Sequence, residues 1–227
     1  MRKILVSVLL LAIVLVVLDR VAVVGVQREV ARQIEAAYDL SATPTVTVNG
    51  IPFLTQAIAG RYEEVTIEMG DITQEGVSLS SVNATLYGVR APLMDLIQNA
   101  ESVDLRAERV TGSVVVSYAT LDARAPRGIK VKGGNNNTIQ ISGNLTVLGQ
   151  TVPVTADMKV ALAKDSIRVT PESVKIAGGV PVPNAERLVS FTIPIKDLPL
   201  NLKLTKVSPT AAGLLLQGTA SDVPLRS

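Results

Sequence analysis

The chain has 227 residues and a formal net charge of only +2, which gives no reason to expect nucleic acid, whose binding depends on many phosphate contacts. It contains no Trp, Cys or His, which excludes disulfides, Ser-His-Asp or Cys-His catalysis and the commonest transition-metal ligand. The chain is long enough to bury an ordinary core. Composition does not exclude catalysis by carboxylates, but we expect no enzyme, no metal and no cofactor.

The N-terminus begins with two cations and a long apolar run. Arg2 and Lys3 precede Ile4–Leu18, and apolar residues resume at Val21–Val26 after a short charged interruption. A membrane-spanning helix needs about 20 residues, whereas the core of a signal peptide has about 7–15. The shorter run therefore fits a cleaved signal, and the longer run fits a retained anchor.

We favour an anchor over residues 1–26, because the best small-x-small cleavage site, at Val23 and Gly25, is poor. Asp19 and Arg20 are then expected to reach for the membrane interface. The positive-inside rule places the N-terminus in the cytoplasm, so the chain is expected at the cell membrane as a single-pass protein. Both interpretations place the rest of the chain on the extracytoplasmic, periplasmic side.

Helical periodicity continues past the apolar run. An apolar stripe recurs at spacings of three and four, while charged residues occupy the other faces; its members are Val23, Val26, Val30, Ile34 and Ala37. Ser41–Pro44 then ends the helix. We predict a juxtamembrane helix over residues 27–40, either a stalk or an ordinary packing helix, and one β-rich domain over residues 41–227.

From Thr45 onward the hydrophobic period is two, which predicts antiparallel strands with one apolar and one wet face. The clearest examples are Val65–Met69, Val82–Leu86 and Val154–Leu162. Few helices remain to cover the apolar face; the candidates are the end of the juxtamembrane helix, 52–59, 92–98 and 185–189. A sheet with so little helical cover must curl on itself, dimerise or hold an apolar ligand.

The segment Asn49–Tyr62 concentrates apolar residues after an Asn49-Gly50 turn, which is a strong hairpin signal. Pro52 suits the first position of a helix, and Gly60 suits its end. This segment is either a short helix that plugs one end of a sheet or a lid and insertion edge for lipid.

The stretch Gly50–Gln56, followed by Gly60, Tyr62 and Val65, resembles the signature of the actinobacterial LmeA-like family of membrane-anchored, phospholipid-binding envelope proteins. Ile51 stands where the usual family form has Phe. Pattern-level matches cover most of the chain, including Asp19-Arg20, Val114–Leu121, Pro171–Gly178, Leu198–Leu200 and a late strand around Gly213.

This resemblance implies an α+β, mostly β fold similar to the tubular lipid-binding superfamily. In that fold a long, twisted antiparallel sheet curls around a helix as a half barrel and encloses an acyl-chain groove. The resemblance also implies a role in cell-envelope lipid or lipoglycan maturation. The implied partners are phospholipid, the cell membrane and envelope glycosyltransferases.

Two groups of residues are candidates for contact with lipid. The apolar group, expected to bind acyl chains, comprises Ile51, Phe53, Leu54, Ile58, Tyr62, Val65, Ile67 and Leu86. The basic group, expected to contact headgroups or the membrane surface, comprises Arg124, Arg127, Lys130 and Lys132. A cation near an anionic membrane adds about 1 kcal/mol, but a solvated loop and strand edge would carry the same residues.

Two other functions stay open. The domain could be a non-catalytic envelope adaptor or scaffold that presents a sheet edge to enzymes. The acidic residues Glu63, Glu64, Glu68, Asp71 and Glu75 would suit a carboxylate-dependent hydrolase, although nothing fixes two of them about 5–10 Å apart. On a strand they form its wet face. Lipid that co-purifies with the protein would favour the lipid-binding function over both alternatives.

Overall fold

The structure is a computed structural model, and it describes residues 1–38, 40, 42–74, 77–92, 105–125, 128–134, 138–147, 150–164, 166–176, 190–194 and 202–225. These residues form strands with few helices, as the alternating pattern predicts. The elements in chain order are α1 (Arg2–Tyr38), β1 (Thr45–Asn49), α2 (Phe53–Ala59), β2 (Arg61–Met69), β3 (Ile72–Gln74), β4 (Val77–Arg90), β5 (Arg106–Ser117), α4 (Tyr118–Arg124), β6 (Ile129–Gly133), β7 (Ile139–Val147), β8 (Gln150–Ala163), β9 (Ser166–Ile176), β10 (Phe191–Pro194), β11 (Lys203–Pro209) and β12 (Gly213–Pro224).

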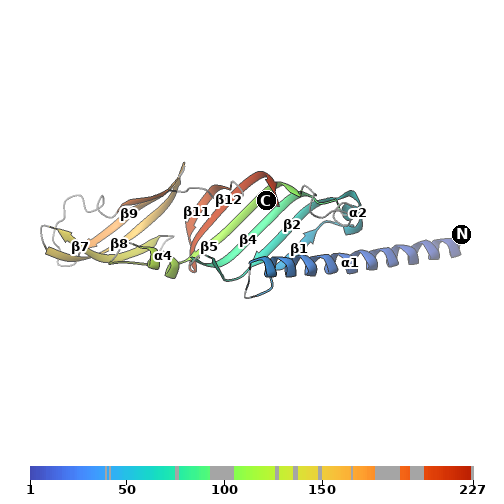
Figure 1. Ribbon diagram of the computed structural model, residues 1–227, viewed down its shortest axis with the longest axis horizontal. Coiled ribbons are helices and arrows are strands. Elements are labelled where there is room, and N and C mark those ends of the chain that lie inside the picture. Colours follow the sequence, from blue (N-terminus) through green and yellow to red (C-terminus); the bar gives the residue numbers. More distant parts are fainter. Residues whose placement is uncertain are drawn as a thin grey trace. The chain divides into compact units, whose positions relative to one another are not determined.

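The strands form two open antiparallel sheets (Figure 1). The first has seven strands in the order β1-β2-β4-β5-β12-β11, with β3 paired to β4. The second is a meander in the order β10-β9-β8-β7-β6, in which each strand pairs with the next one along the chain. The prediction of a mostly β, antiparallel fold behind an N-terminal apolar helix is confirmed, with the strands divided between two sheets.

The helix α1 is continuous for 37 residues and passes through the Asp19-Arg20 interruption without a break. Its large apolar side chains from Ile4 to Leu18 are between 47% and 71% exposed, so this part packs against nothing that the structure describes. The apolar stripe of the later part is packed: Val23 and Ala31 are buried, and Val26, Val30 and Ile34 are half-buried. The helix thus continues past the apolar run as far as Tyr38.

The described chain divides into two compact units, each assembled from several stretches. Unit 1 comprises Met1–Met69, Asn83–Gly112 and Ala220–Ser227, and unit 2 comprises Gly70–Val82 and Ser113–Thr219. In unit 1, α1 packs against β1 and α2. In unit 2, apolar side chains from alternate strand positions form the core: Ile139, Ile141, Val154, Ala156, Met158, Ile167, Val169, Val207 and Leu214.

The strand β8 shows how the sequence produces the core of unit 2. Val154, Ala156 and Met158 alternate with polar residues and are all buried, as the period of two predicts. The packed side of this sheet also contacts β11 and α4. The side chain of Ser117 caps α4 by accepting a hydrogen bond from the N–H of Thr120 at 3.2 Å. The pattern at 114–121 gave no sign of this helix.

The Asn49-Gly50 turn is present, with φ of +98° at Gly50, but it does not make a two-residue hairpin. The strands β1 and β2 do pair antiparallel, from Thr45 opposite Glu68 to Asn49 opposite Glu64. Their connection contains the whole of α2, because the chain passes from the turn into Pro52, which precedes the helix in an extended conformation. The helix candidates at 92–98 and 185–189 lie largely or wholly outside the described residues.

Candidate functional site

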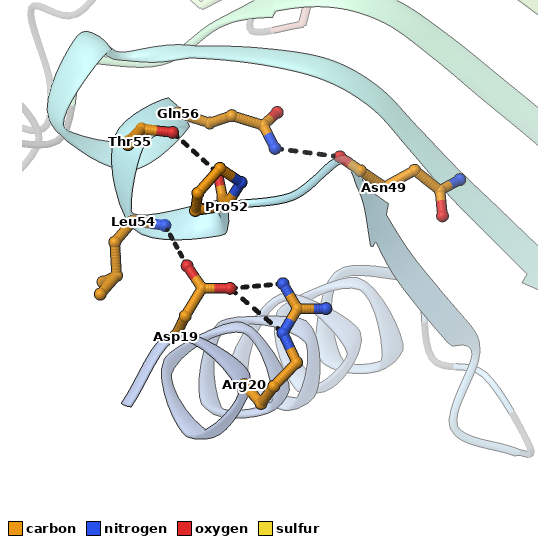
Figure 2. Close-up of polar contacts among 7 residues, drawn as sticks. All are labelled: Asp19, Arg20, Asn49, Pro52, Leu54, Thr55 and Gln56. Atoms are coloured by element: carbon orange, nitrogen blue, oxygen red, sulfur yellow. Dashed lines mark hydrogen bonds and ion pairs between the residues drawn. The ribbon is translucent and has the colours of Figure 1, made fainter. Parts of the chain in front are cut away.

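The first turn of α2 is held by a carboxylate from α1. Oδ1 of Asp19 accepts a hydrogen bond from the backbone N–H of Leu54 at 2.7 Å, and the guanidinium of Arg20 pairs with Oδ2 (Figure 2). The helix needs this contact because Pro52 gives no side-chain cap, and the first N–H groups of a helix have no partner inside it. Asp19, only 4% exposed, thus acts as the cap of a helix distant from it in the sequence.

The other side of α2 is tied to β1 and β2 by one buried amide. Nε2 of Gln56 donates to the carbonyl of Asn49 at 3.2 Å, and its Oε1 accepts from the N–H of Glu63 at 2.9 Å. Figure 2 shows Gln56 extending from α2 toward the end of β1. Because these two strand ends are joined through a single side chain, Gln56 closes the loop that contains α2.

The C-terminal end of α2 is fixed by backbone geometry. Gly60 adopts the left-handed conformation with φ of +64°, as a helix-ending glycine does, and its carbonyl accepts from the N–H of Ala91 at 2.9 Å. A Cβ at Gly60 would stand 2.7 Å from Cα of Pro92. Both the conformation and the close approach therefore require glycine at this position.

Three of the predicted lipid-contact residues belong to the core. Phe53 is 2% exposed and packs on Tyr62 with ring centroids 6.0 Å apart. Burial raises the pKa of the Tyr62 phenol. Leu86 is also buried, whereas Leu54, Val65 and Ile67 are half-buried.

The remaining two members of the apolar group point outward. Ile51, which precedes α2, and Ile58, in the last turn of α2, are 82% and 85% exposed. The structure therefore brings all the predicted residues of the 51–62 segment together around α2, but on two sides of it. Phe53 and Tyr62 face the interior of unit 1, and Ile51 and Ile58 face outward.

An open groove of about 440 Å³ lies between the later part of α1 and β1, within the range of small-molecule sites, roughly 300–1,000 Å³. We call it the α1–β1 groove. Its lining comprises Val24, Gln27, Arg28, Ala31, Arg32, Glu35, Thr43, Pro44, Thr45 and Val46. The residues Ala31, Pro44 and Val46 are buried and give it an apolar floor. The exposed Arg28 and Arg32 stand one helical turn apart, and Arg32 forms a surface ion pair with Glu29 at 3.5 Å.

The basic group is only partly described. Lys130 and Lys132 occupy exposed positions on β6, and Nζ of Lys130 lies 2.9 Å from Oδ2 of Asp122. The same carboxylate accepts from the N–H of Val131 at 2.9 Å, and these contacts hold the pKa of Asp122 below its usual value. Arg127 and the side chain of Arg124 lie outside the described residues, so the headgroup role of this run stays a prediction.

Unit 2 contains a second hollow, of about 400 Å³, between the ends of β6 and β11. It is lined by Gly133, Gly134, Thr138, Pro209, Thr210 and Ala211. The phenol of Tyr118 closes part of this region by donating to the carbonyl of Thr210 at 2.8 Å. No cluster of His, Cys, Asp or Glu suited to a metal occurs among the residues that the structure describes. The lining of small side chains offers a ligand neither a charged group nor a large apolar wall.

Fold and site together define a mostly β protein with an apolar N-terminal helix long enough to cross a membrane, with a mean hydropathy of 2.8 in its most apolar window. The sequence matches the LmeA-like phospholipid-binding family over residues 17–219, so the chain belongs to that family. Comparison with curated proteins and with solved structures found no match. The resemblance inferred from the Gly50–Gln56 signature is confirmed.

The sequence does not reveal that Asp19 and Gln56 organise α2. The spacing of Asp19 from Val23 places it at the head of the same buried stripe, but this spacing does not predict that it caps α2. Gln56 belongs to the family signature, which by itself gives it no role. A buried polar residue is hydrogen-bonded in nearly every case, but its partners are set by tertiary structure and leave no local signal.

Proposed function

We propose that this protein is a membrane-anchored phospholipid-binding protein that holds its lipid at the α1–β1 groove. The observation that carries the proposal is the composition of that groove, an apolar floor beneath two exposed arginines on a helix whose first part is apolar and exposed. Membership of a phospholipid-binding family supports the ligand class. A binding protein, and not an enzyme, is the function that the family description favours.

The chemistry of the groove fits one end of a phospholipid. Arginine side chains at positions i and i+4 can both donate to a phosphate, and charge-assisted hydrogen bonds of this kind are the strong ones. The floor of Ala31, Pro44 and Val46 offers apolar contact to the glycerol and the start of an acyl chain. The groove can take only part of a two-chain lipid, so we expect the rest of the chains to remain on the apolar surface beside it.

We further propose that the N-terminal helix is retained as the anchor and is not removed as a signal peptide. Cleavage near Val23 and Gly25 would remove Asp19, which caps α2, together with buried packing at Val23. Arg2 and Lys3 favour a cytoplasmic N-terminus, so residues 41–227 would be extracytoplasmic. Protease added to spheroplasts should then digest the domain, and a domain protected until lysis would contradict this topology.

Native mass spectrometry of the full chain, released from detergent, tests the ligand. We expect phospholipid to remain bound to the wild type and anionic lipid to be depleted in the double variant Arg28→Gln/Arg32→Gln. One lost hydrogen bond to a charged group is worth about 1.5–3 kcal/mol, so a reduction in affinity of about tenfold or more is expected.

The matched control is Lys203→Gln/Lys206→Gln, which removes the same charge from exposed positions on β11. Wild-type protein without lipid would contradict the binding function and would favour the adaptor. Equal depletion in both double variants would show a general charge effect and would remove the groove as the site. A role in envelope lipid or lipoglycan maturation is our proposal from the family resemblance, and glycosyltransferase partners belong to the same proposal.

A further inference from the structure

The outward side of α2 is unusually apolar for a surface helix. Ile51 and Ile58 are each more than 80% exposed, and Leu54 is half-buried one turn before Ile58. No other large apolar side chain among the described residues outside α1 exceeds 42% exposure. A single exposed apolar residue needs no explanation, but two at this level in and just before one short helix, beside an apolar helix, indicate a contact surface.

The contact with Asp19 fixes where α2 lies along α1. Leu54 is hydrogen-bonded to Asp19, the residue that immediately follows the exposed run Ile4–Leu18. The run of 15 residues is about 22 Å long at 1.5 Å per residue, whereas the apolar layer of a bilayer is about 30 Å thick. The run alone is therefore too short to cross the membrane.

The missing length must come from the next turns of α1. A span of about 20 residues that starts at Ile4 ends near Val23, about one turn beyond Asp19. The exposed Val21 and Val24 suit such an environment. The charge of Asp19 is covered by α2 and paired with Arg20, which allows it to lie at this depth. The helix α2, which is hydrogen-bonded to Asp19, then lies at the edge of the apolar layer of the membrane.

We propose that Ile51, Leu54 and Ile58 form an apolar foot that enters the bilayer beside α1, in the leaflet from which α1 emerges. The occupant of this surface is the lipid of that leaflet, since the foot continues the apolar surface of α1. Arg61 and Arg90 stand at the strand ends next to α2 and share Glu108 at 2.7 and 3.3 Å. Cations beside an apolar face are typical of elements that lie in the membrane interface.

The inference rests on the proposed anchor, and the absence of Cys allows both to be tested with single labels. The full chain is reconstituted in vesicles of phosphatidylcholine and phosphatidylglycerol, with an environment-sensitive fluorophore on Ile58→Cys or, independently, on Ile51→Cys. Both side chains are exposed, so the substitutions should not disturb the fold. The reference variants are Leu9→Cys in the apolar run and Lys206→Cys on β11.

We expect lipids with a quencher near the headgroup to reduce the emission of the Ile51 and Ile58 labels at least twofold, and to leave the Lys206 label unchanged. A quencher deeper in the acyl chain should affect the Leu9 label most. A quenched Leu9 label with unquenched labels at Ile51 and Ile58 would overturn the foot alone, and an unquenched Leu9 label would overturn the anchor and the foot with it. Emission that depends on the protein-to-lipid ratio but not on the quencher would assign the surface to a second copy of the chain and overturn the proposal.

Discussion

Gln56 should contribute more to the local stability of α2 than any of its surface neighbours. Replacement by Met keeps an unbranched side chain of similar length and removes both hydrogen bonds, to the carbonyl of Asn49 and from the N–H of Glu63. Each bond contributes about 0.5–1.5 kcal/mol net, so the free energy of local opening should fall by about 1–3 kcal/mol. The lower part of that range applies if water can hydrogen-bond to the Asn49 carbonyl and the Glu63 N–H in the variant.

Hydrogen exchange followed by mass spectrometry measures this effect directly. At about 1.4 kcal/mol per factor of ten, protection of the Glu63 amide should fall about 5- to 150-fold in Gln56→Met. Thr55→Val is the control, because Thr55 is exposed and the hydrogen bond of its hydroxyl to the carbonyl of Pro52 lies at the surface. Unchanged exchange in Gln56→Met, or an equal effect of Thr55→Val, would refute the role assigned to this amide.

Two further predictions concern the core and a surface ion pair. Phe53→Ala should destabilise the protein by about 3–5 kcal/mol, because the ring is buried against Tyr62. Leu54→Ala should destabilise it less, because Leu54 is only half-buried. Equal melting temperatures of the two variants would contradict this placement of the two side chains. The pKa of Asp122 is lowered in the folded chain, so the stabilisation from its bonds to Lys130 and Val131 is complete above the unfolded value near 3.8 and is lost as the pH falls through the lower folded value. The hydrogen-exchange rate of the Val131 amide, corrected for its intrinsic pH dependence, should therefore rise in the wild type as the pH falls below the folded pKa of Asp122. The Asp122→Asn variant should show no such rise. Equal pH dependence in the two proteins would contradict this role of the Asp122 carboxylate.

The strands could be predicted because their information is local. The alternation at Val154–Met158 places one apolar side chain after another on the same face, and the structure buries all three of them. The helix α4 escaped prediction because it is a single short element whose start depends on the cap at Ser117. The division of the strands into two sheets depends on long-range pairing, such as that of β12 with β5, which no local pattern encodes.

The residues of the α1–β1 groove, including Arg28 and Arg32, were not among those that the sequence predicted to contact lipid. The residues around α2 could be predicted in composition but not in arrangement. The segment does form a short helix between the ends of β1 and β2, and its apolar residues gather there. Their separation into a buried side at Phe53 and an exposed side at Ile58 follows from the orientation of a helix that is only seven residues long. That orientation is set by Asp19 and Gln56, two polar contacts that only the folded chain brings together.

A last prediction concerns the contact between α1 and α2, and it distinguishes the exposed first part of α1 from its packed later part. Asp19 and Val23 are both buried, and at a spacing of four residues they lie on one face. One alanine inserted after Val21 rotates them apart by about 100°, so one of them must leave its contact. The same insertion after Leu11 moves only residues that are exposed, and the family match, which begins at residue 17, does not extend to that part of the helix. We expect hydrogen exchange of the Leu54 amide to accelerate in the first insertion variant and to stay at the wild-type rate in the second. If both insertions leave the rate unchanged, Asp19 does not hold α2, and if both accelerate it equally, the helix acts through its length and not through this contact.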